Sequence, residues 1–207
     1  MKLWTIQPAS VLRRLQREGA LQVDRTKYRE LPAAYEWMAS EMVRRKGWKR
    51  GHLPWWFHCK KPSPEKQRRA WPAGRRMVVM EFEMPRERVL VMPAWAWNHV
   101  YSQDFLAFSR REHSKWERDL AGGVRNVDRR PLPRDWNARL RSSWERLFNR
   151  RLPRSHWDPG NFWAVPGKVA IAEALELECL VNAQAYTGTS RSWLRAHLSL
   201  RKAKRKG

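Results

Sequence analysis

The sequence predicts an α+β fold in which helices pack around a small mixed β-sheet. Segments of alternating apolar and polar residues occur at both ends of the chain, and amphipathic helical segments lie between them. A chain of 207 residues is long enough for one substantial hydrophobic core. We therefore expect a single α+β domain over residues 1–190, followed by a basic C-terminal tail over residues 191–207.

The N-terminal segments predict a strand and two helices. Residues 3–7 alternate between apolar and polar side chains, which is typical of a short strand. Residues 8–21 predict an amphipathic helix that ends at Gly19. Residues 31–47 predict a second helix, whose basic last turn precedes Gly47.

The middle of the chain carries the clearest strand signal. Residues 53–60 predict a short strand, and the prolines and charges of residues 61–76 predict a loop. Residues 77–93 predict two extended runs joined by a turn. In the first run one face would carry Val79, Glu81 and Glu83, and the other would carry Val78, Met80, Phe82 and Met84.

The C-terminal half predicts more helix. Residues 94–121 and residues 133–152 both have helical periodicity. The residues that recur at helical spacing in the second segment are Trp136, Leu140, Trp144 and Leu147.

An acidic island over residues 169–188 contains three glutamates and no lysine or arginine, in a chain of formal net charge +23. If residues 169–181 form a strand, Glu173 lies among apolar neighbours on one face, and Glu176 and Glu178 lie on the other. A lone carboxylate among apolar groups raises its pKa, pairs with arginine or borders a ligand cleft. The alternative is a helix with solvated glutamates, and residue propensity leaves both alternatives open.

The basic charge predicts a polyanionic partner, and nucleic acid is the natural candidate. The chain has 43 lysines and arginines and a pI near 11.3, and such residues gain affinity for phosphate backbones through counterion release. The alternative is that the arginines reflect a GC-rich genome. The residues expected to bind nucleic acid are Arg110, Arg111, Arg139, Arg141, Arg150, Arg151, Lys202, Lys204 and Arg205.

The tryptophans also suit nucleic acid, because bases stack on aromatic rings. Trp55, Trp56, Trp95 and Trp97 are the candidates among the 14 tryptophans. The alternative, which we favour for most of the 14, is that they fill a hydrophobic core.

Several common classes of protein find no support in the sequence. It lacks the GxxxxGK[ST], GxGxxG, HExxH and GxSxG motifs. Cys59 and Cys179 have no CxxC spacing, and we expect neither a disulfide nor a metal site. Without a signal peptide or a long apolar segment, we expect a soluble cytoplasmic protein and no membrane partner. The oligomeric state stays open.

Several segments, in order, are similar to those of the bacterial domain of unknown function family 3841. They are "MKLWTIQP", "AAYEWMASEM", "LPWWFHC", "VMEFEMPRERVLV", "AWNHVYS" and "SWERLF". The resemblance covers most of residues 1–186, and it implies a closing strand in which Glu176 stands on the family's glutamate. Ile171 and Leu175 depart from the glutamine and tryptophan that are usual in that strand.

More distantly, the layout resembles the ADP-ribosyltransferase fold, in which a split sheet holds NAD. The resemblance implies that Glu176 or Glu173 stabilises the cationic centre as nicotinamide departs, with Thr5, Gln7 and Trp56 binding the cofactor. It implies an NAD-dependent ADP-ribosyltransferase-like enzyme that acts on nucleic acid or a nucleic-acid-associated protein. The alternative is a non-catalytic basic nucleic-acid-binding module, in which the glutamates pair with arginines.

Overall fold

A computed structural model of the chain describes residues 1–27, 32–124, 131–149, 151–153, 157 and 167–189. The chain forms two compact units. Unit 1 comprises Met1–Val23, Trp55–Val89 and Ala172–Gly207, and unit 2 comprises Asp24–Pro54 and Leu90–Ile171. The predicted α+β class is confirmed, because both units combine helices with strands. The single domain stays a prediction, and the predicted tail lies outside the described residues.

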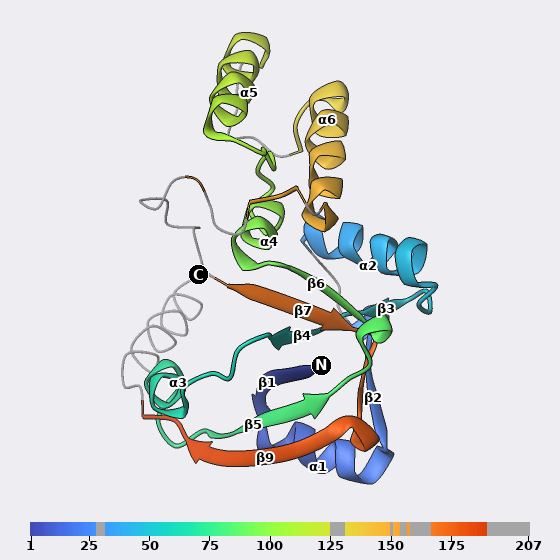
Figure 1. The fold of residues 1–207 in the computed structure, drawn as a ribbon, viewed down its shortest axis with the longest axis vertical. Helices are drawn as coiled ribbons and strands as arrows, with labels where there is room; N and C mark the ends of the chain where they lie inside the picture. Colours follow the sequence, from blue (N-terminus) through green and yellow to red (C-terminus); the bar gives the residue numbers. More distant parts are fainter. Residues whose placement is uncertain (28–31, 125–130, 150, 154–156, 158–166, 190–207) are drawn as a thin grey trace, which may run out of the picture. The chain divides into compact units, whose positions relative to one another are not determined.

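Unit 1 contains an antiparallel sheet in the order β4-β1-β5-β9, where a mixed sheet was expected (Figure 1). The strand β2 pairs separately with β8, and α1 packs against β1 and β5. The elements of this unit are β1 (Lys2–Pro8), α1 (Ala9–Glu18), β2 (Ala20–Asp24), β4 (Trp55–His58), α3 (Pro64–Ala70), β5 (Arg76–Glu83), η2 (Arg86–Arg88), β8 (Ala174–Glu176), η4 (Leu177–Cys179) and β9 (Leu180–Thr187).

The pairing of β1 with β5 places one apolar face of each strand in the core. Leu3 lies opposite Phe82, and Thr5 lies opposite Met80. All four side chains are buried, and Phe57 of β4 meets Phe82 edge-on with ring centroids 5.7 Å apart. Val78, Met80, Phe82 and Met84 are all buried, as their predicted face implies, whereas Glu81 is half-buried and Glu83 is exposed. Val79 on the second face is buried as well, so burial alternates only over the C-terminal part of the strand.

Unit 2 is mostly helical. In it β6 and β7 are neighbours, and α2 packs against α4. Tyr35 of α2 meets Trp97 of α4 edge-on at 5.6 Å. The elements of this unit are η1 (Arg25–Lys27), α2 (Ala33–Lys46), β3 (His52–Leu53), β6 (Val89–Pro93), α4 (Ala94–Tyr101), α5 (Arg110–Gly123), α6 (Arg134–Trp144), η3 (Glu145–Phe148) and β7 (Lys168–Ala172).

Two predicted segments differ from the structure. Residues 61–76, expected as a loop, contain the short helix α3, because Ser63 caps its first turn and Pro64 suits its first position. The predicted helix over 94–121 is interrupted between α4 and α5. Gln103 ends α4 with φ of 58°, where the amides of Gln103 and Asp104 donate to the carbonyls of Val100 and His99.

The acidic island is extended, but it is not one continuous strand as expected. β7 ends at Ala172, Glu173 is a bend, and η4 separates β8 from β9. These breaks let one segment pair with different strands: β8 with β2, and β9 with β5. The helical alternative is wrong for this segment, and its C-terminal part joins the sheet of β1 and β5.

Within the parts of the chain that the structure describes, no helix has both the length and the apolar character needed to cross a membrane.

We expect Gly188→Ala to destabilise unit 1 by about 1–3 kcal/mol, the usual cost of overpacking. A Cβ at Gly188 would overlap the carbonyl oxygens of Pro72 and Trp71. The control is Gly122→Ala in α5, where a Cβ meets nothing within 4 Å and should stabilise the helix by about 0.5–1 kcal/mol. Thermal unfolding measures both. Equal effects of the two substitutions would contradict the tight packing at Gly188.

Candidate nucleic-acid interface

Two of the three glutamates of the acidic island lie beside one arginine of unit 1. Arg88 Nη1 lies 2.7 Å from Glu176 Oε2 and 3.4 Å from Glu178 Oε1. The Cys179 thiol donates to Glu176 Oε2 at 3.5 Å. Glu176 and Glu178 therefore share a cationic partner.

This cluster also changes the pKa of its members. The carboxylates of Glu176 and Glu178 raise the pKa of Arg88, so the guanidinium stays charged. Burial, and then the hydrogen bond to Glu176, raise the pKa of the Cys179 thiol. Ligand atoms of Glu176, Glu178 and Cys179 lie within 4.8 Å of one another, which is close enough for metal ligation. Arg88 already pairs with both carboxylates of this cluster, and we assign no metal to it.

The other residues implied for NAD lie in unit 1. Thr5 is 2% exposed, and its hydroxyl accepts a hydrogen bond of 2.9 Å from Gln7 Nε2. Trp56 and Glu173 are half-buried. Neither Thr5 nor Gln7 forms a hydrogen bond or ion pair with Glu176 in the described part of the chain. The catalytic and cofactor-binding roles of these residues stay predictions.

The predicted nucleic-acid-binding residues that the structure describes lie in three places: on α5, on α6 and beyond η3. Arg110 and Arg111 are exposed in the first turn of α5, Arg139 and Arg141 are exposed on α6, and Arg151 is exposed beyond η3. Arg139 and Arg141 are two positions apart on a helix and therefore project in different directions. The remaining four, Arg150, Lys202, Lys204 and Arg205, lie outside the described residues.

Arg139 belongs to a set of aromatic rings and guanidinium groups that contact one another. This set, here called the aromatic–arginine ladder, consists of Phe105, Trp116, Trp136, Arg139 and Arg146. Phe105 and Trp116 stack with ring centroids 4.4 Å apart and an interplanar angle of 11°. Arg139 Cζ lies 4.5 Å from the Trp136 ring centroid and 5.3 Å from that of Trp116. Arg146 Cζ lies 5.2 Å from the Phe105 centroid.

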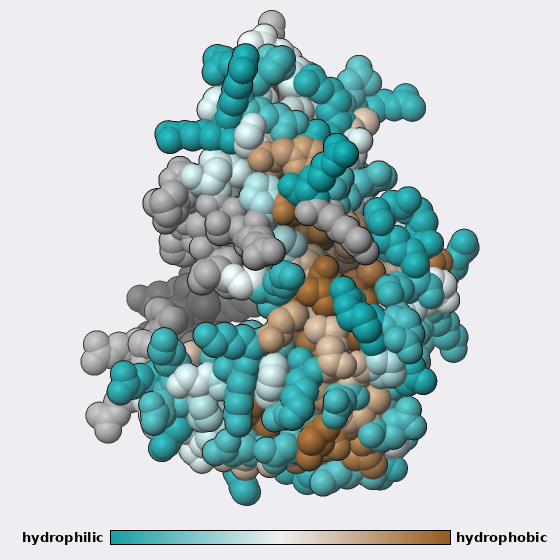
Figure 2. Space-filling model, in the orientation of Figure 1, coloured by the Kyte–Doolittle hydropathy of each residue, from teal (hydrophilic) through white to brown (hydrophobic). Residues whose placement is uncertain are grey.

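Four members of the ladder line a groove of about 560 Å³ between α5 and α6, here called the α5–α6 groove: Phe105, Trp116, Arg139 and Arg146. Lys115 and Arg139 lie 2.6 Å and 3.8 Å from Asp119 Oδ2. The hydrogen bond from Lys115 lowers the pKa of Asp119, which therefore stays ionised at neutral pH. The other residues that line the groove are Glu112, Ala138, Ser142 and Ser143. Hydrophilic side chains cover the outside of this helical pair in Figure 2.

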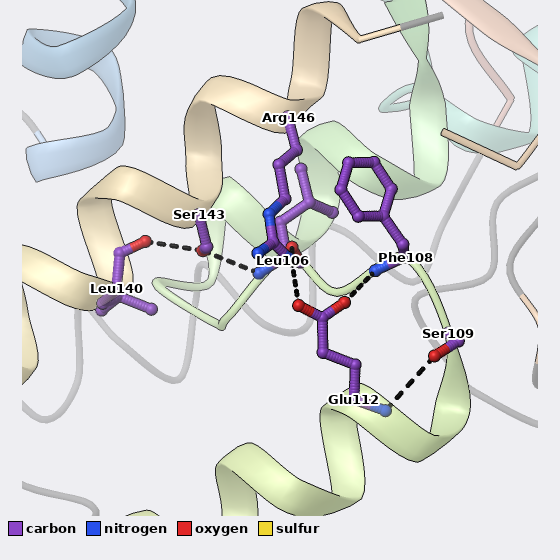
Figure 3. Close-up of polar contacts among 7 residues, drawn as sticks. All are labelled: Leu106, Phe108, Ser109, Glu112, Leu140, Ser143 and Arg146. Atoms are coloured by element: carbon purple, nitrogen blue, oxygen red, sulfur yellow. Dashed lines mark hydrogen bonds and ion pairs between the residues drawn. The ribbon is translucent and has the colours of Figure 1, made fainter. Parts of the chain in front are cut away.

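Glu112 and Arg146 fix the base of the groove (Figure 3). Glu112 accepts from Arg146 Nη1 at 2.6 Å and from the Phe108 amide at 2.8 Å. Ser109 Oγ accepts from the Glu112 amide at 3.3 Å, so Glu112 also belongs to the cap of α5. Arg146 donates to the Leu106 carbonyl at 3.0 Å, and buried Ser143 accepts from the Leu106 amide at 3.0 Å.

Three of the four tryptophans proposed for base stacking are buried or hydrogen-bonded within the protein. Trp95 and Trp97 are buried in α4, which confirms the core alternative for both. Trp55 is half-buried, and its Nε1 donates to the Leu21 carbonyl at 2.7 Å. The sequence placed Trp136 at helical spacing, which is typical of a core residue, and it did not single out Phe105, Trp116, Lys115 or Arg146. The separation of three residues between Trp136 and Arg139 was the available signal for a ring–guanidinium contact on one helix face.

The chain thus belongs to the α+β class, with a helical pair that carries a groove lined by aromatic and cationic side chains. A family model described as "Domain of unknown function (DUF3841)" matches residues 2–169. The chain belongs to this family, as the sequence resemblance indicated. Neither the curated proteins nor the solved structures contain a match to this chain.

We expect Glu112→Ala to lower the free energy of unfolding by about 1–3 kcal/mol, because it leaves Arg146 and the Phe108 amide without their shared acceptor. Glu117→Ala on the same helix is the control, since that side chain is 63% exposed and a surface change costs within about 0.5 kcal/mol. Urea unfolding measures the difference. Equal midpoints for the two variants would show that Glu112 does not fix the connection between α4 and α5.

Proposed function

We propose that this protein binds nucleic acid and that the α5–α6 groove contacts its phosphates. The observation that carries the proposal is the position of Arg139 at the groove, over the rings of Trp116 and Trp136. Rings on which a guanidinium rests restrict its rotation, so less side-chain entropy is lost when its N–H groups bind a phosphate. Lys115 adds a second cation to the same wall.

Charge supports this proposal at two scales. A chain of formal net charge +23 attracts polyanions over a Debye length of about 8–10 Å. Within the groove, two cations, Lys115 and Arg139, form ion pairs with the one carboxylate of Asp119. Arg146 forms an ion pair with Glu112. The lining therefore keeps one positive charge in excess, and the exposed Arg139 is the group best placed to exchange a carboxylate for a phosphate.

The acidic island favours this binding function over the ADP-ribosyltransferase-like activity. Arg88 pairs with Glu176 and Glu178, which is the arrangement expected of a module whose glutamates pair with arginine. To stabilise a developing cation, the Glu176 carboxylate would first have to give up its ion pair with Arg88.

Incubation with labelled NAD tests the enzymatic alternative. Transfer of the label to an acceptor by the wild type that Glu176→Gln abolishes would support the alternative, and no transfer by the wild type would count against it.

We expect the dissociation constant for a fluorescent 12-nucleotide single strand to rise steeply with KCl concentration. Each phosphate contacted contributes about 0.7 to the slope of log K against log salt for a single strand. Arg139→Gln should therefore reduce that slope by about 0.7. Trp136→Ala should weaken binding without any change of charge, because Arg139 loses the ring that positions it.

The matched control for charge is Arg13→Gln, which removes an exposed arginine from α1 in unit 1. This variant should bind with the wild-type slope. The proposal is wrong if wild-type affinity is independent of salt. Equal losses in Arg13→Gln and Arg139→Gln would instead show that binding uses diffuse charge and not the α5–α6 groove.

A further inference from the structure

A second cavity lies beside the aromatic–arginine ladder in unit 2, here called the Phe105–Trp116 cavity. Its volume is about 280 Å³, and Phe105 and Trp116 belong to its lining as well as to that of the α5–α6 groove. Leu120, Leu132 and Leu140 supply apolar surface. This size and these walls suit a flat heteroaromatic group.

The polar lining of this cavity differs in charge from the groove. It consists of Asp104, Glu117, His113 and Gln103, with no lysine or arginine among the described lining residues. Glu117 Oε2 lies 3.4 Å from His113 Nδ1, and Asp104 Oδ2 lies 3.9 Å from His99 Nδ1. Two carboxylates next to a cationic groove would repel a phosphate and attract hydrogen-bond donors.

The backbone around Asp104 is held firmly. The Asp104 amide donates to the His99 carbonyl at 2.8 Å, and its carbonyl accepts from Trp144 Nε1 at 2.9 Å. Gln103, just before it, is the one non-glycine residue with positive φ in the described part of the chain. Glycine is usual at this helix-ending position, but here the residue has a side chain, and that side chain lines the cavity.

We infer that the Phe105–Trp116 cavity binds a guanine base of a single strand, an inference that rests on the proposed nucleic-acid binding. The Watson–Crick edge of guanine carries adjacent N1–H and N2–H donors, and the carboxylates of Asp104 and Glu117 each offer an acceptor oxygen to this edge. Adenine, cytosine and uracil each place a ring nitrogen or carbonyl acceptor beside their donor, and that acceptor would face the carboxylates. In a duplex the guanine donors are already paired, so the base must be unpaired to enter.

The experiment compares four fluorescent eight-nucleotide RNAs with the full-length protein. One is all uridine, and the others carry a single central guanosine, inosine or 7-deazaguanosine. Guanosine should tighten binding about tenfold, the effect of one good bidentate base contact. Inosine lacks the N2 amino group and should lose most of this gain, whereas 7-deazaguanosine keeps both donors and should retain it.

Asp104→Asn and Glu117→Gln keep side-chain size and replace an acceptor oxygen with a donor. Each should reduce the guanosine preference to about threefold or less, since one acceptor is lost from the bidentate contact. Asp135→Asn, on an exposed residue of α6, should keep the full preference. Glu117 is 63% exposed, so its variant tests the inference even if Asp104→Asn unfolds.

Three results would overturn the inference and leave the proposed function standing. They are equal affinity for the all-uridine and guanosine RNAs, a guanosine preference unchanged in both carboxylate variants, and a preference that persists when the guanosine is paired in a duplex. Failure of every RNA and of the 12-nucleotide strand to bind would instead contradict nucleic-acid binding itself.

Discussion

The architecture of the helical pair depends on how the main chain between α4 and α5 is hydrogen-bonded. That connection has no regular secondary structure, and its polar groups need partners wherever they are buried. Side chains of α6 and η3 supply them: Trp144 reaches the Asp104 carbonyl, and Ser143 and Arg146 reach the two polar groups of Leu106. Glu112 of α5 then binds Arg146. One set of contacts therefore fixes both helices and the rings of the aromatic–arginine ladder.

Opposite charges have different roles in the two units. In unit 1 Glu176 and Glu178 of the acidic island pair with Arg88, and Glu176 also accepts from the Cys179 thiol, at the end of β8 and along η4. In unit 2 the carboxylates of Glu112 and Asp119 hold cations at the wall of the α5–α6 groove. Surface pairs of this kind contribute about 0–1 kcal/mol each, so their main effect is to orient side chains.

The sequence predicted the helices and strands that have a periodic pattern of apolar residues. It missed the helix ends and breaks that depend on the backbone conformation of single residues. Alternation over 78–84 identified β5 because Val78, Met80 and Phe82 share a face of that strand and are buried. The break between α4 and α5 had no glycine or proline to mark it, since Gln103 takes the left-handed conformation. Likewise, the sequence named Arg139 as a candidate for its charge alone, and only the fold brings it over Trp116, which lies 23 positions away in the sequence.

The central claim, that the α5–α6 groove is the surface that contacts nucleic acid, is tested most directly by mapping contacts on the intact protein. Ultraviolet cross-linking to a single-stranded oligonucleotide, followed by mass spectrometry of the peptides, reports which side chains touch a base. We predict cross-links at Phe105, Trp116 or Trp136, whose rings line or adjoin the groove, and their loss at high salt. Cross-links confined to unit 1 or to residues 191–207 would contradict the claim.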